Sequence, residues 1–169
     1  MIKSVENLNE TAAACTRCLE DKLSGTDGKR HIVLCGGTGC LSNNSAEIRH
    51  HFEEVLEKKG LTERATVNQV GCFGFCSQGP FVKIYPEDTL YRLGKIEDVE
   101  EIVEQDILKH TVVERLLYVD PATGEKISRQ EDINFYKKQR RVALRGCGVI
   151  NPEDIMEALG MGAFQGLKR

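Results

Sequence analysis

Four cysteines occur as two pairs, and each pair closes a short loop that contains glycine. The first pair is Cys35-Gly-Gly-Thr-Gly-Cys40, and the second is Cys72-Phe-Gly-Phe-Cys76. Four thiolates that converge on one small inorganic core are the ligands of an iron–sulfur cluster, and glycine lets the backbone wrap such a core and direct N–H groups at the sulfurs. The pattern therefore predicts iron ligation by Cys35, Cys40, Cys72 and Cys76. The glycines expected to supply this freedom are Gly36, Gly37, Gly39, Gly71 and Gly74.

Other uses of these cysteines fit the pattern less well. Structural zinc sites favour pairs spaced by two to four residues, so both pairs lie at the loose edge of that range. Disulfides need an oxidising compartment, and the segment that starts at Met1 has no secretion signal. A single nucleophilic cysteine needs no three companions in glycine-containing loops. A zinc-binding structural or regulatory adaptor stays as the alternative to a redox protein.

Composition limits the class of protein. The chain has 169 residues, 40% of them hydrophobic and 29% charged, which suffices for one domain with a core plus an appendage. A formal net charge of −3 gives no basic footprint for nucleic acid. No apolar run approaches the length of about 20 residues that a membrane helix needs. Seven cysteines without a secretion signal favour a reducing cytoplasm.

Strands and helices alternate in the middle of the chain. We expect strands at 31–35, 66–70, 81–85 and 90–92, and helices at 44–60 and 96–107. The first two strands are joined through a helix, which predicts a parallel pair with a right-handed crossover, whereas the last two form an antiparallel hairpin. This is the layout of a thioredoxin-like domain, an α/β fold. Alternation around Lys83 predicts one wetter face for its strand.

The helix at 44–60 has the clearest local signals. Asn44, with Glu47 three residues on, resembles a capping box, and Gly60 supplies a left-handed stop. Its single apolar face is predicted to pack on the sheet. The residues of that face are Ile48, Phe52, Val55 and Leu56.

Three segments are expected along the chain. Residues 1–28 form a polar arm with one weak helical stripe, and residues 29–111 form the thioredoxin-like domain. Residues 112–169 contain few apolar segments, so they are expected to act as a docking extension. The stripe of the arm consists of Val5, Leu8, Ala12 and Leu19.

Two stretches resemble known families. The two cysteine loops and the run from Gly71 to Pro86 resemble the thioredoxin-like 2Fe-2S ferredoxins. Residues 118–126 and 134–154 are similar to the start of the flavin-bearing, NADH-oxidising subunit of respiratory-type enzymes. This fused arrangement is typical of the beta subunit of electron-bifurcating iron-only hydrogenases and of related NAD(P)-dependent hydrogenases and formate dehydrogenases. Together the resemblances cover roughly residues 31–165.

The resemblance implies a one-electron carrier within a larger complex. A 2Fe-2S cluster would be the cofactor, with no catalytic side chain in this chain and no complete active site. The flavin-binding glycine-rich loop and the later cysteines of the flavoprotein family are missing, which suggests a truncated or split form. FMN and NAD(P) are therefore expected only on the missing flavoprotein core or on a partner subunit. The expected partners are other subunits of an NAD-linked hydrogenase or formate dehydrogenase.

The remaining cysteines form a weaker pattern. Cys15-Thr-Arg-Cys18 is a C-x-x-C unit that could be half of a second metal site, although unligated surface thiols are the preferred explanation. Cys147 lies at what looks like an apolar strand end, where packing is the default. The side chains that could complete the half-site are Cys147, His31, His50, His51 and His110. His50 and His51 are expected on the exposed flank of the helix at 44–60.

Two further groups have both a structural and a functional interpretation. Phe73 and Phe75 flank Gly74, so they either shield the cluster or simply belong to the core. One dense basic run is expected to be either a solvated face or a docking surface for an acidic partner subunit. The run consists of Lys137, Lys138, Arg140 and Arg141.

Overall fold

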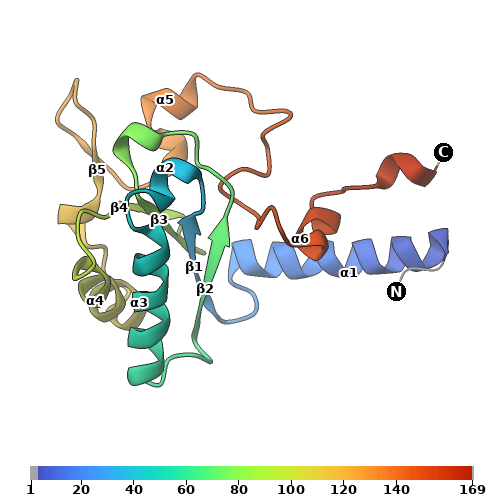
Figure 1. Ribbon diagram of the computed structural model, residues 1–169, viewed down its shortest axis with the longest axis horizontal. Helices are drawn as coiled ribbons and strands as arrows, with labels where there is room; N and C mark the ends of the chain where they lie inside the picture. The colour runs from blue at the N-terminus through green and yellow to red at the C-terminus, as the bar shows by residue number, and fades with distance from the viewer. Residues whose placement is uncertain (1–3, 169) are drawn as a thin grey trace.

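A mixed sheet forms the centre of the protein. The computed structural model describes residues 4–168, and the order of its main sheet is β2-β1-β3-β4 (Figure 1). The strands are β1 (Arg30–Cys35), β2 (Ala65–Val70), β3 (Phe81–Tyr85) and β4 (Thr89–Arg92). β1 runs parallel to β2 and antiparallel to β3, and β3 and β4 form a hairpin. The predicted thioredoxin-like α/β layout is confirmed.

Helices cover one face of this sheet. α3 (Ser45–Lys58) and α4 (Asp98–Ile102), which continues as a π-helical turn over Val103–Ile107, pack on that face (Figure 1). The predicted apolar side of α3 is buried, and the chain leaves the helix through Gly60 at a φ of 64°. A left-handed residue at this position favours glycine. The apolar spacing in α3 and the glycine at its end therefore predicted the helical face of the fold correctly.

The start of α3 differs from the prediction. Asn44 occupies the N-cap position, but its φ is 63° and its side chain makes no capping hydrogen bond. A short helix, α2 (Thr38–Leu41), comes just before, and the Asn44 backbone N–H donates to the Leu41 carbonyl at 3.2 Å. The predicted capping box is therefore wrong, because the left-handed turn out of α2 directs the Asn44 side chain away from the first turn of α3.

The extension at residues 112–168 begins in the core on the helical side, with Val113 and Leu116, and then packs on the other face of the sheet. β5 (Tyr118–Val119) and β6 (Lys126–Ile127) form a small hairpin, and isolated bridges join Tyr91 to Leu117 and Thr89 to Arg129. α5 (Asn134–Lys137) and α6 (Ile155–Gly160) follow, and a 3-10 helix over Gln165–Lys168 comes after α6. A second hydrophobic core forms here, between the sheet and the extension, and includes Val33, Phe81 and Ile133.

This covering changes the environment of Lys83. Every residue of β3 is buried, and only 6% of Lys83 is exposed. The Lys83 ammonium lies 2.5 Å from a carboxylate oxygen of Asp88 and donates to the Gln130 amide oxygen at 3.2 Å. Burial lowers the pKa of Lys83, which the Asp88 carboxylate partly offsets. The predicted wetter face of this strand is therefore wrong, because the extension excludes water from it.

A long helix, α1 (Val5–Ser24), precedes the sheet and packs against α6 (Figure 1). Ser4 caps its start by accepting a hydrogen bond from the Asn7 N–H. Ala12 and Leu19 are buried as predicted, whereas Val5 is 50% exposed. Cys15 and Lys22 complete the buried face, on the side that α6 covers. Among the described residues, no helix combines the length and the apolar character needed to cross a bilayer.

Candidate metal centre

The two cysteine loops leave the sheet at the same edge. β1 and β2 are parallel, and Cys35 at the end of β1 lies opposite Val70 at the end of β2. Each loop begins directly after its strand, so the topology brings the two loops together. Cys35 and Cys40 are buried, Cys72 is half-buried, and Cys76 is exposed.

The sulfurs of each loop lie near each other. Cys72 Sγ and Cys76 Sγ are 3.6 Å apart, and Cys35 and Cys40 are close enough for the ionisation of each thiol to depend on the other. Two thiolates on one tetrahedral metal, with metal–sulfur bonds of about 2.3 Å, lie about 3.8 Å apart. Within residues 4–168 no three His, Cys, Asp or Glu side chains surround one point that could hold a single metal ion. The two pairs adjoin each other, because a Cβ atom added to Gly37 would lie 3.1 Å from Cys72 Sγ and 3.5 Å from Cys35 Sγ.

Protonation differs among these thiols. The hydrogen bond from Cys40 lowers the pKa of Cys35 to about 6, against the opposing effect of burial. The same hydrogen bond, in which Cys40 is the donor, raises the pKa of the Cys40 thiol. Burial raises the pKa of Cys72 to about 11. Cys35 is therefore the thiolate most readily formed at neutral pH, and Cys40 and Cys72 would need a bound cation to lose their protons.

Backbone N–H groups point at the sulfurs. The Gly74 N–H donates to Cys72 Sγ at 3.2 Å. The backbone N–H groups of Phe73 and Gly37 help to lower the pKa of Cys35, and the Phe81 N–H partly offsets the rise in the pKa of Cys40. Such donors stabilise thiolate charge and set the reduction potential of an iron–sulfur centre.

Glycines line the space around the sulfurs. A Cβ atom added to Gly37 would lie 3.1 Å from Cys72 Sγ, and one added to Gly79 would lie 2.6 Å from Cys40 Sγ. A Cβ on Gly39 would lie 3.6 Å from Cys76 Sγ. Gly79 was not among the glycines predicted for this role, because it follows the second loop in the sequence and resembles an ordinary Gly-Pro turn. Four thiolates, several N–H donors and these open positions fit the requirements of a 2Fe-2S cluster.

The extension also contacts the second cysteine loop. The Gly71 N–H donates to the Ile150 carbonyl at 2.9 Å, and the Gly148 N–H donates to the Gly71 carbonyl at 3.1 Å. The Tyr136 hydroxyl donates to the Phe73 carbonyl at 3.0 Å in a buried position. The sequence contains no signal for the role of Tyr136, since α5 is only four residues long and too short to show a periodic pattern.

The two phenylalanines of the second loop join an aromatic cluster. Phe73 is 1% exposed and packs edge-on against Phe81, with ring centroids 6.2 Å apart. Phe75 is half-buried and stacks on Phe135 of α5, with centroids 4.8 Å apart and an interplanar angle of 13°. Tyr118 contributes a further contact with Phe75 at 5.6 Å. Both rings therefore pack in the second core, next to the cysteines.

The other cysteines lie apart from the pairs. Cys15 is buried where α1 crosses α6, and a Cβ on Gly160 would lie 2.8 Å from the Cys15 carbonyl oxygen. Cys18 is exposed. The description of both as surface thiols is therefore wrong for Cys15. Cys147 is half-buried in a turn and not in a strand, because Gly148 adopts a φ of 77° and reverses the chain.

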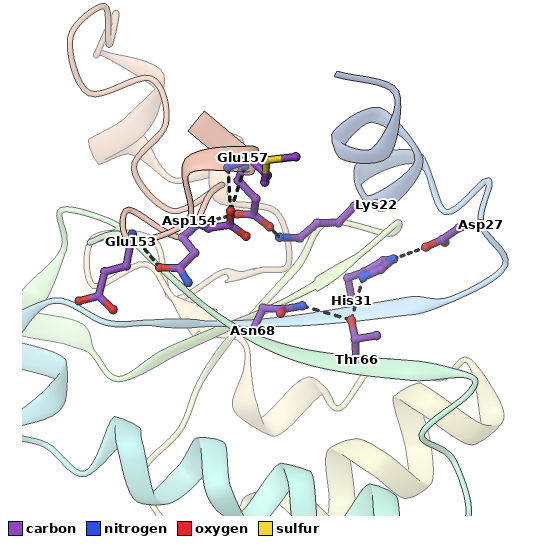
Figure 2. Close-up of polar contacts among 10 residues, drawn as sticks. Lys22, Asp27, His31, Thr66, Asn68, Glu153, Asp154 and Glu157 are labelled. Atoms are coloured by element: carbon purple, nitrogen blue, oxygen red, sulfur yellow. Dashed lines mark hydrogen bonds and ion pairs between the residues drawn. The ribbon is translucent and has the colours of Figure 1, made fainter. Parts of the chain in front are cut away.

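The histidines have partners of their own. Figure 2 shows His31 of β1 between Asp27 and Thr66, with both contacts at 2.8 Å. His50 is exposed beside Glu53 and Glu54, as predicted. His51 is half-buried near Glu54, so only one of the pair has the predicted exposure.

His110 and the basic run complete the predicted candidates. His110 Nδ1 lies 2.5 Å from the Arg30 guanidinium. Lys137, Lys138 and Arg140 are exposed, whereas Arg141 is half-buried with its guanidinium 5.6 Å from the centre of the Tyr136 ring. The basic run therefore follows directly from the helix that covers the second cysteine loop.

Comparison with known proteins identifies the family. The model of the thioredoxin-like [2Fe-2S] ferredoxins matches residues 24–106. A 2Fe-2S ferredoxin of Clostridium pasteurianum is 44% identical over 96 residues, which are 52% of this chain and 94% of that protein. A 2Fe-2S ferredoxin of Aquifex aeolicus (strain VF5) is 34% identical over 79 residues, which are 46% of this chain and 71% of that protein.

A solved structure is also similar. The crystal structure of the wild-type thioredoxin-like [2Fe-2S] ferredoxin from Aquifex aeolicus covers 52% of this chain and 94% of its own, with 31% identity and a TM-score of 0.48. The family model matches up to residue 106, so most of α1 and all of the extension lie outside the matched segment. The sequence relatives nevertheless match over most of their own length, so this chain belongs to the thioredoxin-like [2Fe-2S] ferredoxin family.

Proposed function

We propose that this ferredoxin is the one-electron carrier module of a multisubunit NAD(P)-linked oxidoreductase. The candidates are a hydrogenase, including the electron-bifurcating type, and a formate dehydrogenase. Cys35, Cys40, Cys72 and Cys76 would hold the cluster, two thiolates to each iron. The observation that carries the proposal is the meeting of two cysteine pairs, with N–H donors on their sulfurs, at one edge of the sheet.

The protein's own groups have a limited task in this function. When bound, a 2Fe-2S cluster accepts and releases one electron at a time. The thiolates would fix its position, and the N–H groups of Phe73 and Gly74 would stabilise the additional negative charge. One electron arrives from a donor and one leaves to an acceptor, so no covalent bond changes and no proton-transfer side chain is required.

The extension supports the proposed assembly. Residues 118–126 and 134–154 are similar to the start of a flavin-bearing subunit, and the same segment lies against the second cysteine loop. FMN and NAD(P) would then belong to a partner subunit or to a flavoprotein core. The exposed Lys137, Lys138 and Arg140 follow Phe135 of the Phe75–Phe135 stack within five residues, which favours an acidic partner surface on this side of the protein.

The proposed compartment is the cytoplasm. All seven cysteines carry free thiols in the structure, although Cys72 Sγ and Cys76 Sγ are neighbours. Thiols kept reduced are ready to ligate iron, and a reducing cytoplasm maintains them in that state.

A spectrum of anaerobically purified protein tests the proposed cofactor. We expect a brown protein, bleached by dithionite, that contains two irons and two sulfides per chain. A colourless protein with one bound zinc would instead support an adaptor and would end the electron-carrier proposal.

A pair of variants tests the ligands. Cys72→Ala should lose most of its iron, because the alanine methyl group offers no ligand atom to the centre. Cys18→Ala changes an exposed cysteine outside the loops, so its iron content should equal that of the wild type. Equal iron in both variants would contradict the assignment of Cys72.

A further inference from the structure

One peptide group of the second cysteine loop is hydrogen-bonded at both ends. Its carbonyl belongs to Phe73 and accepts from the Tyr136 hydroxyl at 3.0 Å. Its N–H belongs to Gly74 and donates to Cys72 Sγ at 3.2 Å. The hydroxyl of Tyr136 is thus connected to a proposed iron ligand through a single peptide unit.

Hydrogen bonds on the two ends of a peptide reinforce each other. A donor at the carbonyl oxygen withdraws electron density from the amide, which makes the N–H more acidic and a better donor. Such cooperativity strengthens each bond by about 10–30% in condensed-phase estimates. The Tyr136–Phe73 contact is buried, where the effect is less screened than in water.

We propose that Tyr136 sets the reduction potential of the centre by polarising the Phe73–Gly74 peptide. A stronger N–H bond to Cys72 Sγ stabilises the state that carries the added electron, so the Tyr136 hydroxyl raises the potential. Tyr136 is a positioning and tuning residue, not an iron ligand. This inference rests on the proposed function, since it requires a cluster on Cys72.

The surroundings of Tyr136 hold its hydroxyl in place. The side chain is 7% exposed, and its ring meets the Phe75 ring edge-on at 6.1 Å and the Phe135 ring at 5.1 Å. The guanidinium of Arg141 lies over the ring, 5.6 Å from its centre. Burial raises the pKa of Tyr136, so the hydroxyl keeps its proton and remains a donor at physiological pH.

Tyr136 belongs to the extension and lies outside the residues that the family model matches. The matched domain supplies the four cysteines and the peptide, whereas the extension supplies the group that polarises the peptide. The extension is therefore assigned an electronic role at the centre, in addition to its packing role.

The test is a redox titration of the full chain, monitored in the visible range and by electron paramagnetic resonance. Tyr136→Phe removes only the hydroxyl. At a fixed applied potential its ratio of reduced to oxidised cluster should fall about threefold, which is about 28 mV for a one-electron couple. Tyr118→Phe is the matched control, because the Tyr118 ring also contacts Phe75 but its hydroxyl has no recorded bond to the Phe73 carbonyl within the described part of the chain. Its potential should equal that of the wild type.

A second substitution keeps the hydroxyl and changes its strength. Fluorotyrosine at position 136 is a more acidic donor of nearly the same size, so it should shift the potential upward, opposite to Tyr136→Phe. Equal potentials for the wild type, Tyr136→Phe and the fluorotyrosine protein would overturn the inference and leave the electron-carrier proposal intact. If Tyr136→Phe lost its cluster, an unchanged potential in the fluorotyrosine protein would overturn it. A wild-type chain without a cluster would instead contradict the proposed function.

Discussion

The two cysteine loops are held by different parts of the molecule. Cys35 and Cys40 are buried, and their loop leads through α2 into α3, whose apolar side packs on the sheet. Cys72 and Cys76 are less buried, and their loop is covered by the extension through Tyr136, Gly148 and Ile150. The first loop depends on contacts within the thioredoxin-like domain, whereas the second also depends on residues more than sixty positions away.

This difference assigns two tasks to the chain. Under the proposals above, the family domain would provide the ligands, and it holds the Cys35–Cys40 pair in a buried position. The extension would hold and tune the other pair, because Tyr136 donates to the Phe73 carbonyl within the second loop. An electron partner that contacts the extension would therefore reach the centre from the side of Cys72 and Cys76.

The largest effect is expected at the first pair. Gly79→Ala places a Cβ 2.6 Å from Cys40 Sγ, and the buried sulfur has little room to move. The variant should lose most of its iron, measured per chain after anaerobic purification. Gly94→Ala is the control, since its Cβ meets no atom within 4 Å and its iron content should be unchanged. If Gly79→Ala kept the iron content of the wild type, the absence of a side chain at Gly79 would not be required for Cys40 to bind iron.

A smaller effect is expected at the second loop. Gly148 has a φ of 77°, and a Cβ there would lie 2.6 Å from the Phe73 ring. Gly148→Ala should lower the free energy of unfolding by about 1–2 kcal/mol through backbone strain and by about 1–3 kcal/mol more through displacement of the ring. Denaturant unfolding of the apoprotein measures this change.

Gly28→Ala separates the two causes. Gly28 has a φ of 73° and open space around it, so its substitution carries the strain without the collision. The holoprotein of Gly148→Ala should also bleach faster in air than that of Gly28→Ala. If Gly148→Ala and Gly28→Ala had equal unfolding free energies and equal bleaching rates, the contact between Gly148 and the Phe73 ring would not stabilise the second loop.

The ion pair that joins the extension to α1 should contribute less to the free energy of unfolding. Lys22 of α1 donates to Glu157 of α6 at 2.7 Å (Figure 2). The Glu157 carboxylate also accepts from the Asn151 N–H. Lys22→Met leaves a largely buried carboxylate without its cation, and we expect a loss of about 1–3 kcal/mol in the free energy of unfolding. Lys59→Met, which breaks the more exposed pair with Glu104, should cost about 0–1 kcal/mol. Similar losses in Lys22→Met and Lys59→Met would mean that the ion pair between α1 and α6 stabilises the fold no more than an exposed one does.

The smallest effect concerns pH. Burial opposes ionisation of Asp98, but hydrogen bonds from Arg115 and from the Gly94 and Lys95 N–H groups hold its pKa below the ordinary value. Because the folded-state pKa is depressed, this contribution to stability is present above the unfolded-state pKa of about 3.9 and is lost as pH falls through the folded-state pKa. The unfolding curves of wild type and Asp98→Asn should therefore converge in acid. Parallel curves would contradict the assignment.

The helical side of the fold was predictable because its signals are local. The spacing of Ile48, Phe52 and Val55 defines a face, and Gly60 marks an end, without reference to the rest of the chain. The extension was not predictable in the same way. Its contacts are single hydrogen bonds between distant residues, such as Gly71 with Ile150, and these leave no periodic pattern.

The candidate site also has a part that was predictable from the sequence and a part that was not. Cysteine spacing and strand order together were enough to suggest that Cys35 and Cys72 would meet, because parallel strands deliver their loops to one edge. The roles of Gly79 and Tyr136 depend on where atoms from separate segments come to lie. The burial of Lys83 was missed for the same reason, since a covering segment cannot be inferred from the alternation of its own strand.

The central claim is that both cysteine loops hold one 2Fe-2S cluster together. Electron paramagnetic resonance of the full chain, purified anaerobically and reduced with dithionite, tests it most directly. We expect a signal that integrates to one unpaired electron per chain, because one electron is shared by a single two-iron centre. A fully metal-loaded chain that gives no signal after reduction, or that carries zinc in place of iron, would contradict the claim.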